Sequence, residues 1–347
     1  MNRVELPSPD RVIGPDGTAV LGRYAETPAE LGLADFVYRD VMGRRRSKIA
    51  RRANFKQFEY FGVVSDEVIA GCALANVQLI GAAFTYVFLP KTGQFLSRSL
   101  KRPLAAGLRL SSSPRSGESR FSSGKNTVEM SYSAAPNRRT LMVRTDNGIE
   151  IDATFADDHT DCEPMAITTQ TGRNGWVFAN KIAGVPTAGR IASPLGDFDL
   201  ETVGAFAHHD YSAGFMRRET FWNWACLSGR IADGTRVGLN VSCGVNETGD
   251  SENCIWVDGA LETIGPCRFE FSRTDDRAPW TVRSTDGRVE LRFHPLGQHR
   301  ERLNLWLMAT DFRQDFGRFE GTLKTNDGRT LDVTGLTGFC EDHFSRW

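Results

Sequence analysis

Repeated Asp-Gly and Asn-Gly dipeptides constrain the fold of this chain more than any other feature of its sequence. They include those at 16–17, 147–148, 233–234, 258–259, 286–287 and 327–328. Most are flanked by alternating apolar and polar residues, which is the strongest short-range signal for a β-hairpin. Sequential hairpins build meander sheets, sandwiches or barrels. The sequence therefore predicts an all-β protein.

Four segments show the hairpin pattern clearly. In residues 139–156, RTLMVRTDNGIEIDATFA, the apolar residues Leu141 and Val143 precede the turn, and Ile149 and Ile151 follow it. The pattern recurs over 229–242, 280–294 and 317–335. A dinucleotide-binding fold is disfavoured, because no βαβ alternation and no GxGxxG after a strand occur.

The length of 347 residues exceeds what one hydrophobic core usually supports. A passage rich in Gly, Ala and Pro at 181–197 predicts a boundary between two β domains, residues 50–190 and residues 195–347. The N-terminal segment, residues 1–49, is expected to be partly helical or irregular. Its best helix candidate spans residues 34–48.

One basic run stands out in a chain whose formal net charge is −1. Its members are Arg44, Arg45, Arg46, Lys48, Arg51, Arg52 and Lys56. The run could contact phosphate or an acidic lipid surface, or it could be a solvated segment that leads into the first strand. No KH or RNP signature follows it, so nucleic acid is not an expected partner.

Neither an apolar targeting segment at the start nor a run of 18 apolar residues occurs in the sequence. The seven cysteines form no C-x-x-C pair, which indicates free thiols in a reducing cytoplasm. Near the end, Glu341 and His343 could converge, but Asp342 between them points the other way on an extended chain. We therefore expect no metal site, and no motif indicates a cofactor.

Three strands are expected over 56–63, 67–76 and 78–89. The second and third are apolar on both faces, so they lie between packed layers or line an apolar cavity. These two strands contain small residues, which would leave space beside the wall that the strands form: Gly71, Ala73, Ala75, Gly81, Ala82 and Ala83. The serine-rich segment at 101–125 is expected to be a long, partly ordered connection or a flap over a cavity mouth.

Residues 208–229, HHDYSAGFMRRETFWNWACLSG, concentrate acidic, basic and aromatic groups. Read with a period of two, Trp222, Trp224 and Arg218 share one face of a strand, and Asn223 lies on the other. An arginine beside tryptophans can stack on them.

This stretch can be a site or a structural network. As a site, His209 or Asp210 would transfer protons, Arg218 would hold an oxyanion or carboxylate, and Asn223 would orient a polar group. As a network, Asp210 would cap a turn and the charged residues would satisfy one another.

A second polar cluster falls within residues 238–259. Its members are Asn240, Asn246, Thr248, Glu252 and Asn253. Asparagines that donate and accept hydrogen bonds without charge suit a few fixing points in an apolar cavity. They serve turn geometry equally well, so both interpretations stay open.

Three stretches carry a family resemblance: FKQFEYFGVVSD, RRETFWNWACLSGRIADGTRVGLNVSCGVNETGDSENCIWVDG and GFCEDHFSRW. From about residue 20 onward the chain resembles the bacterial family DUF2804. More distantly, it is similar to the AttH-like and carotenoid-hydratase (CrtC-type) lipocalin-like superfamily. The resemblance implies two tandem lipocalin-like (calycin-like) antiparallel β-barrels.

The resemblance also bears on single residues. Asp210 matches an aspartate of the wider superfamily, although Tyr211 and Ser212 stand where relatives carry a basic residue and Glu. The KxWxYWG motif of the relatives corresponds here to Lys56, Phe58, Tyr60, Phe61 and Gly62. Aromatic bulk that includes Tyr60 is kept while the indoles are lost. Assigned activities in the superfamily include water addition to isoprenoid alkenes and cyclisations in hydrophobic pockets.

We therefore expect a double-barrel protein that binds a hydrophobic small molecule resembling a lipid or isoprenoid. It would be a cofactor-independent hydratase, isomerase or cyclase with Asp210 as proton donor, unless Arg218 keeps that carboxyl ionised, and His209 as the substitute. The polar fixing points would be Asn223, Asn240 and Asn253. A non-catalytic carrier, or a scaffold with a filled interior, stays open, as do the oligomeric state and contact with a membrane surface.

Overall fold

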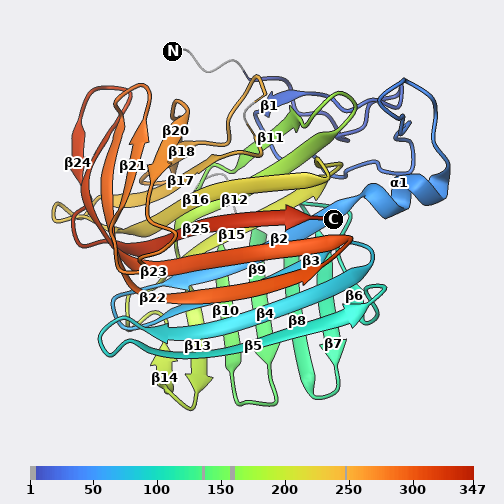
Figure 1. The fold of residues 1–347 in the computed structure, drawn as a ribbon. Helices are drawn as coiled ribbons and strands as arrows, with labels where there is room; N and C mark the ends of the chain where they lie inside the picture. The colour runs from blue at the N-terminus through green and yellow to red at the C-terminus, as the bar shows by residue number, and fades with distance from the viewer. Residues whose placement is uncertain (1–4, 135–136, 157–160, 247) are drawn as a thin grey trace.

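The computed structural model describes residues 5–134, 137–156, 161–246 and 248–347 (Figure 1). Within these ranges the chain is built of antiparallel strands and a single helix, α1 (Lys48–Asn54). The expectation of an all-β protein is confirmed. No helix among the described residues has the length and the apolar character that a membrane span requires.

The first sheet has eight strands. Their order is β1 (Gly22–Tyr24), β11 (Met165–Gln170), β12 (Trp176–Pro186), β15 (Phe206–Gly214), β2 (Lys56–Val64), β3 (Ile69–Asn76), β4 (Ile80–Leu89) and β5 (Gln94–Pro103). The three strands expected over 56–89 are confirmed as β2, β3 and β4, which run as a meander.

The second sheet has seven strands. Their order is β14 (Gly196–Asp199), β13 (Ala188–Ser193), β10 (Glu150–Ala156), β9 (Asn137–Arg144), β8 (Asn126–Ala134), β7 (Gly117–Ser123) and β6 (Leu108–Arg109). The hairpin expected over 139–156 is confirmed as β9 and β10. Segment 101–125 is more regular than expected, because it contains β6 and β7.

The third sheet has ten strands. Their order is β19 (Ala260–Thr263), β18 (Cys254–Val257), β17 (Arg236–Cys243), β16 (Glu219–Arg230), β25 (Thr337–Arg346), β23 (Met308–Lys324), β22 (Val289–Leu305), β21 (Trp280–Ser284) and β20 (Cys267–Glu270), and β24 (Thr330–Asp332) pairs with β23. The other three expected hairpins are confirmed as β16–β17, β21–β22 and β23–β24.

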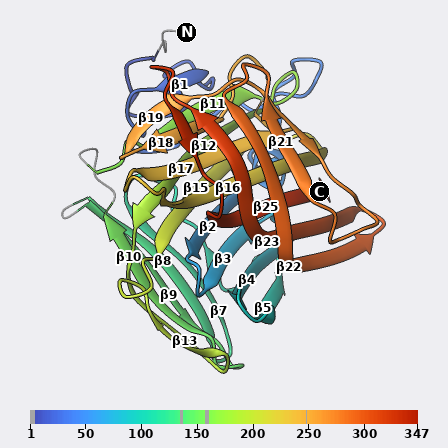
Figure 2. The ribbon, with the colours of Figure 1, turned by 90° about the vertical axis from the view of Figure 1, so that its left-hand side faces the viewer.

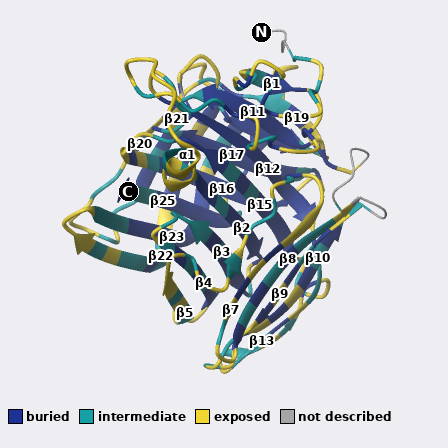
Figure 3. Cartoon of the chain, turned by 90° about the vertical axis from the view of Figure 1, so that its right-hand side faces the viewer, coloured by how far each residue is buried: buried dark blue, intermediate teal, exposed yellow. Residues whose placement is uncertain are grey.

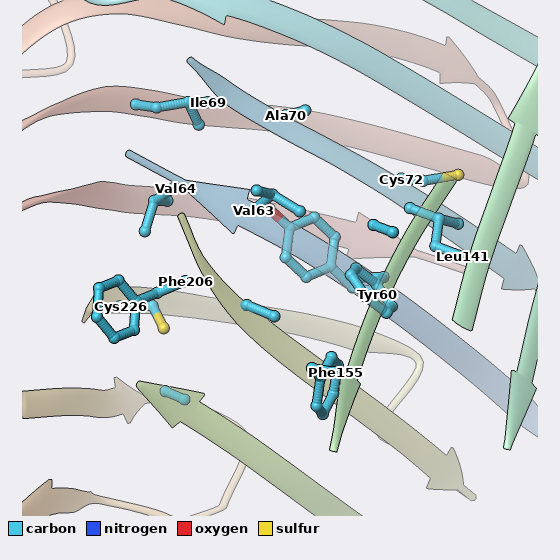
Figure 4. Packing of buried hydrophobic residues seen from close by; sticks show 14 of the residues in the cluster. Tyr60, Val63, Val64, Ile69, Ala70, Cys72, Leu141, Phe155, Phe206 and Cys226 are labelled. Atoms are coloured by element: carbon cyan, nitrogen blue, oxygen red, sulfur yellow. The ribbon is translucent and has the colours of Figure 1, made fainter. Parts of the chain in front are cut away.

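The eight-stranded sheet lies between the other two sheets (Figure 2). On one face, the ring centroid of Phe61 is 5.2 Å from that of Phe155 in the seven-stranded sheet. On the other face, Tyr86 lies 4.6 Å from Phe316 in the ten-stranded sheet. One hydrophobic core thus includes residues of all three sheets, and Figure 4 shows part of it.

Backbone contact joins the eight-stranded and ten-stranded sheets. Gly184 forms a bulge in β12 with φ of +77°. A Cβ atom built on Gly184 would lie 2.9 Å from the backbone nitrogen of Gly238 in β17. Two glycines therefore let the two sheets meet without intervening side chains.

Three expectations about architecture had different outcomes. The helix expected over 34–48 is wrong: this stretch is irregular, and α1 begins only at Lys48, where the Ser47 side chain accepts a hydrogen bond from the Ala50 N–H. In each sheet the paired strands follow a linear order, with β24 as a branch on β23 in the third sheet. The expectation of two closed barrels is therefore not confirmed. The domain boundaries stay a prediction, although β15, from the second expected half, pairs with β2 of the first.

Candidate functional site

An apolar pocket of about 230 Å³ lies between the eight-stranded and ten-stranded sheets. From the first of these sheets it is lined by Phe58, Tyr60, Ala73, Ala75, Ala82 and Phe84. From the second it is lined by Trp222, Trp224, Met308, Phe312, Glu341 and His343. The pocket thus lies between the two tryptophans and the wall of small residues that the sequence indicated.

Strand periodicity explains this wall. Along β2, Phe58 and Tyr60 face the pocket and Phe61 faces the seven-stranded sheet. Across the sheet, Tyr60 pairs with Ala73 in β3, and Ala73 pairs with Phe84 in β4. Because alanines alternate with rings along this row, space remains that larger side chains would fill.

Tyr60 of the pocket lining contacts a second tyrosine, the fully buried Tyr86. The hydroxyl oxygens of Tyr60 and Tyr86 are 2.8 Å apart, and burial raises the pKa of both well above the usual range. A Cβ atom on Gly71 would lie 2.5 Å from the Tyr86 hydroxyl. The glycine therefore makes room for a pair of neutral hydroxyls.

A buried charge cluster lies at one side of the pocket. Lys181 of β12 places its Nζ 2.8 Å from Asp210 Oδ2 and 3.1 Å from Glu252 Oε1. The same ammonium lies 4.7 Å from the ring centroid of Trp224. Asp210 is the register partner of both Lys181 and Tyr60, so the sheet itself places the lysine beside the aspartate.

Burial and the neighbouring charges act in opposite directions on the pKa values of Lys181 and Asp210. Burial alone would lower the pKa of Lys181, but Asp210 and Glu252 outweigh it and raise that pKa, so the lysine stays charged. Burial also raises the pKa of Asp210, against the opposing charge of Lys181. Since one lysine neutralises one carboxylate, the second is either a buried net charge or a protonated acid.

Glu341 and His343 of β25 lie on the facing wall. Glu341 accepts hydrogen bonds from Trp222 Nε1 at 2.7 Å and from Gln314 Nε2 at 3.1 Å. The ring of His343 lies 4.0 Å from that of Trp222, and its Nε2 lies 3.1 Å from the Thr310 hydroxyl. A buried carboxylate therefore faces the pocket with neutral hydrogen-bond donors as its closest partners.

His209 does not line the pocket. It follows His208 and precedes Asp210 on β15, and the period of two sends its side chain to the opposite face. There its Nε2 lies 3.2 Å from Glu59 Oε1 and 3.4 Å from an Arg139 nitrogen, between the eight-stranded and seven-stranded sheets. The structure therefore separates the two predicted proton donors.

Four other predicted polar residues, Arg218, Asn223, Asn240 and Asn253, also lie outside the pocket lining, whereas Asn246 and Glu252 of the predicted polar cluster are part of it. Arg218 is exposed, and its guanidinium is 3.4 Å from the Leu307 carbonyl. Asn223 donates to Asp342 Oδ1 at 2.9 Å, and Asn253 accepts from the Ser242 N–H at 2.7 Å. Asn240 nevertheless acts on the site: it accepts from Trp224 Nε1 at 2.7 Å and so orients a pocket residue.

Sequence reasoning missed Lys181 as a site residue and gave Glu252 no role of its own. Lys181 lies in the passage interpreted as a domain boundary. Its signal was a single lysine inside an apolar strand, because a lysine is almost never buried unless it is paired.

The fold and the pocket define an all-antiparallel β-sheet protein with an apolar pocket that carries buried charges at its walls. Residues 27–347 match the model of the family described as "Domain of unknown function (DUF2804)", and the chain belongs to this family. A search of curated proteins gave no match.

Solved structures share the fold at low sequence identity. CghA, crystallised with Sch210972, is 10% identical with a TM-score of 0.55, over 98% of this chain and 97% of that one. A protein of Nitrosomonas europaea assigned to AttH is 10% identical with a TM-score of 0.50, over 84% and 92%. Kievitone hydratase of Nectria haematococca is 11% identical with a TM-score of 0.45, over 83% and 88%.

Proposed function

We propose that the pocket binds a hydrophobic small molecule, lipid-like or isoprenoid-like, and that the protein converts it without a cofactor as a hydratase, isomerase or cyclase. The observation that carries this proposal is the buried Lys181–Asp210–Glu252 cluster at the wall of an apolar pocket. Apolar walls with a few fixed polar groups are typical of small-molecule sites. The fold shared with CghA, which was crystallised with Sch210972, supports the same class.

Asp210 is the proton donor of the proposed reaction, because burial raises the pKa of its carboxyl. The protonated Asp210 protonates a carbon–carbon double bond, and its O–H electrons return to the carboxylate. The carbocation then loses a proton to a carboxylate such as Glu341, or takes up water whose extra proton passes to that carboxylate, or is attacked by a second double bond to give a cyclic cation that loses a proton to the carboxylate. These outcomes are isomerisation, hydration and cyclisation, and none of them needs an oxidant or a reductant.

The facing wall suits a positive charge that develops in the pocket. Glu341 is buried there, and Trp222 and Trp224, whose π-systems attract cations, line the pocket. Preorganised groups of this kind stabilise a charged transition state more than they would in water.

A pocket-filling variant tests ligand binding. Ala75→Phe places a ring in the pocket, so we expect it to weaken binding of an apolar fluorescent probe at least tenfold. The control is Ala260→Phe, at an exposed position in β19. Native mass spectrometry of the purified protein would identify an apolar compound that co-purifies. Equal probe binding by both variants would contradict the proposal.

A non-catalytic carrier is the second candidate, because the contact with Lys181 favours the ionised form of Asp210. Asp210→Asn separates the two functions. In an enzyme it lowers turnover of the co-purified compound by about 10²–10⁴-fold while binding persists. In a carrier, neither the wild type nor the variant changes the compound.

A further inference from the structure

Large apolar side chains are exposed around one end of the pocket. Two of them, Leu305 and Leu307, flank Trp306 at the turn between β22 and β23, where Trp306 is 90% exposed. The same strands line the pocket through Leu303 and Met308. The turn therefore extends the pocket wall into solvent.

A second pair of exposed leucines lies in the turns at the ends of neighbouring strands. Leu79 joins β3 to β4, and Leu104, which is 78% exposed, follows β5. The Leu104 N–H donates to the Leu79 carbonyl at 2.8 Å. Val77 and Ile80, on either side of Leu79, line the pocket.

These two groups lie at the same end of the pocket. Lys101 of β5 forms an ion pair with Glu301 of β22 at 2.7 Å, so the ends of the two strands lie side by side. We call Leu79, Leu104, Leu305, Trp306 and Leu307 the apolar rim. Figure 3 faces this side of the molecule, with the C-terminus and the ends of β22 and β23 toward the viewer.

The basic run lies on this side as well (Figures 1 and 3). From Val41 to Lys56 the chain has seven basic residues and no acidic one. Arg44, Arg45, Lys48 and Arg52 are exposed, and none of the described acidic side chains forms an ion pair with them. Exposed apolar residues are interspersed with them, including Met42 and Ile49, the latter 82% exposed.

We propose that this side of the molecule docks on an anionic lipid bilayer. The apolar rim enters the interfacial layer, where an exposed tryptophan is favourable, and the basic run contacts the head groups. The occupant is a bilayer rather than a second copy of the chain, because the exposed basic residues of the basic run lie on the same side as the apolar rim and would repel one another across a symmetric interface. The inference goes beyond the proposed function: it holds whatever the pocket binds.

Vesicle flotation with the full chain tests the docking surface. We expect binding to phosphatidylcholine vesicles that contain phosphatidylglycerol, little binding to phosphatidylcholine alone, and a loss of binding as salt increases. Trp306→Ser, and separately the set Arg44→Ser, Arg45→Ser, Lys48→Ser and Arg52→Ser, should each weaken binding at least tenfold. The controls Arg120→Ser and Lys125→Ser change exposed basic residues of the seven-stranded sheet and its turn, and should leave binding unchanged.

Other outcomes would overturn the proposal. No flotation with any vesicle, or equal flotation of the basic-run variant and the wild type, contradicts docking by charge. A dimer in sedimentation velocity that Trp306→Ser dissociates would assign the rim to a second copy. Ala75→Phe should keep vesicle binding while losing the apolar probe, so a failure of docking and a failure of the proposed pocket function are distinguishable.

Discussion

The position of His208 in the fold determines both its contacts and its pKa. Its side chain points toward the ten-stranded sheet, where its Nδ1 lies 3.0 Å from the Ser228 hydroxyl and its ring lies 5.5 Å from Phe339. Burial lowers the pKa of His208 to about 3. The folded protein therefore holds a neutral imidazole over a range of pH in which an unfolded chain would protonate it.

This burial predicts a loss of stability in mild acid. The unfolded chain takes up a proton near pH 6.5 and the folded chain only near pH 3, so the free energy of unfolding falls as pH decreases between these values. At pH 5 the contribution is about 2 kcal/mol. Urea unfolding at pH 7 and pH 5 should show a smaller difference for His208→Leu than for the wild type. His294→Leu, at an exposed position, is the control, and an unchanged difference in His208→Leu would refute the argument.

At the residue level, the sequence predicted which face of a strand a side chain lies on, but it did not predict which residues that side chain contacts. Alternation along β16 correctly puts Trp222 and Trp224 on one face and Asn223 on the other. It cannot indicate which sheet covers a face, so His209 was grouped with Asp210 although a different layer surrounds it. The ion pair of Asp210 with Lys181 joins residues 29 positions apart, and only strand order reveals it.

At the scale of elements, the contact between β12 and β17 depends on glycine. A Cβ atom on Gly238 would lie 2.7 Å from the carbonyl carbon and oxygen of Ala183. Backbone atoms cannot move aside as a flexible side chain can. The same bulge turns the Gly184 N–H toward the Ser228 hydroxyl, at 2.8 Å. Substitution at Gly238 would therefore push the two sheets apart.

We expect Gly238→Ala to lower the free energy of unfolding by about 1–3 kcal/mol because of this overlap. Gly124→Ala is the comparison: Gly124 has φ of +61°, and no atom of the described residues lies within 4 Å of the place its Cβ would take, so this variant reports backbone strain without overlap. Urea denaturation of both variants measures the two effects. A Gly238→Ala protein as stable as the wild type would show that the sheets separate at little cost.

Hairpins were the most predictable elements. Turns such as Asn147–Gly148 require a positive φ, which Gly148 adopts at +85°, so local sequence suffices to define them. The helix over 34–48 was wrong because its apolar spacing was outweighed by Gly43, which takes φ of +81° in a turn. The Gly- and Pro-containing passage at 181–197 contributes to β12, β13 and β14, because tertiary pairing supplies partners that a local pattern does not show.

For the whole molecule, the position of β15 joins the two halves that the sequence predicts as domains. It pairs with β12 on one side and β2 on the other, in the middle of the eight-stranded sheet. The hydrophobic core on both faces of that sheet is shared with the other two sheets. Each sheet therefore depends on its neighbours for buried surface.

The whole chain should unfold in one cooperative transition despite its length. Tryptophan fluorescence and far-ultraviolet circular dichroism should give coincident urea curves. A fragment of residues 1–194 lacks β15 and should not fold, which limited proteolysis would show as rapid degradation. Two separate transitions, or a protease-resistant fragment, would instead support the independent domains 50–190 and 195–347.

The seven tryptophans of the chain are spread over distinct surroundings. Trp222, Trp224 and Trp347 line the pocket, and Trp306 stands almost fully in solvent at the far turn. Quenching of the first group would report occupancy, and a blue shift from Trp306 would report transfer to a less polar medium. The molecule therefore carries intrinsic optical probes for both of its inferred activities, and each can be followed without attaching a label.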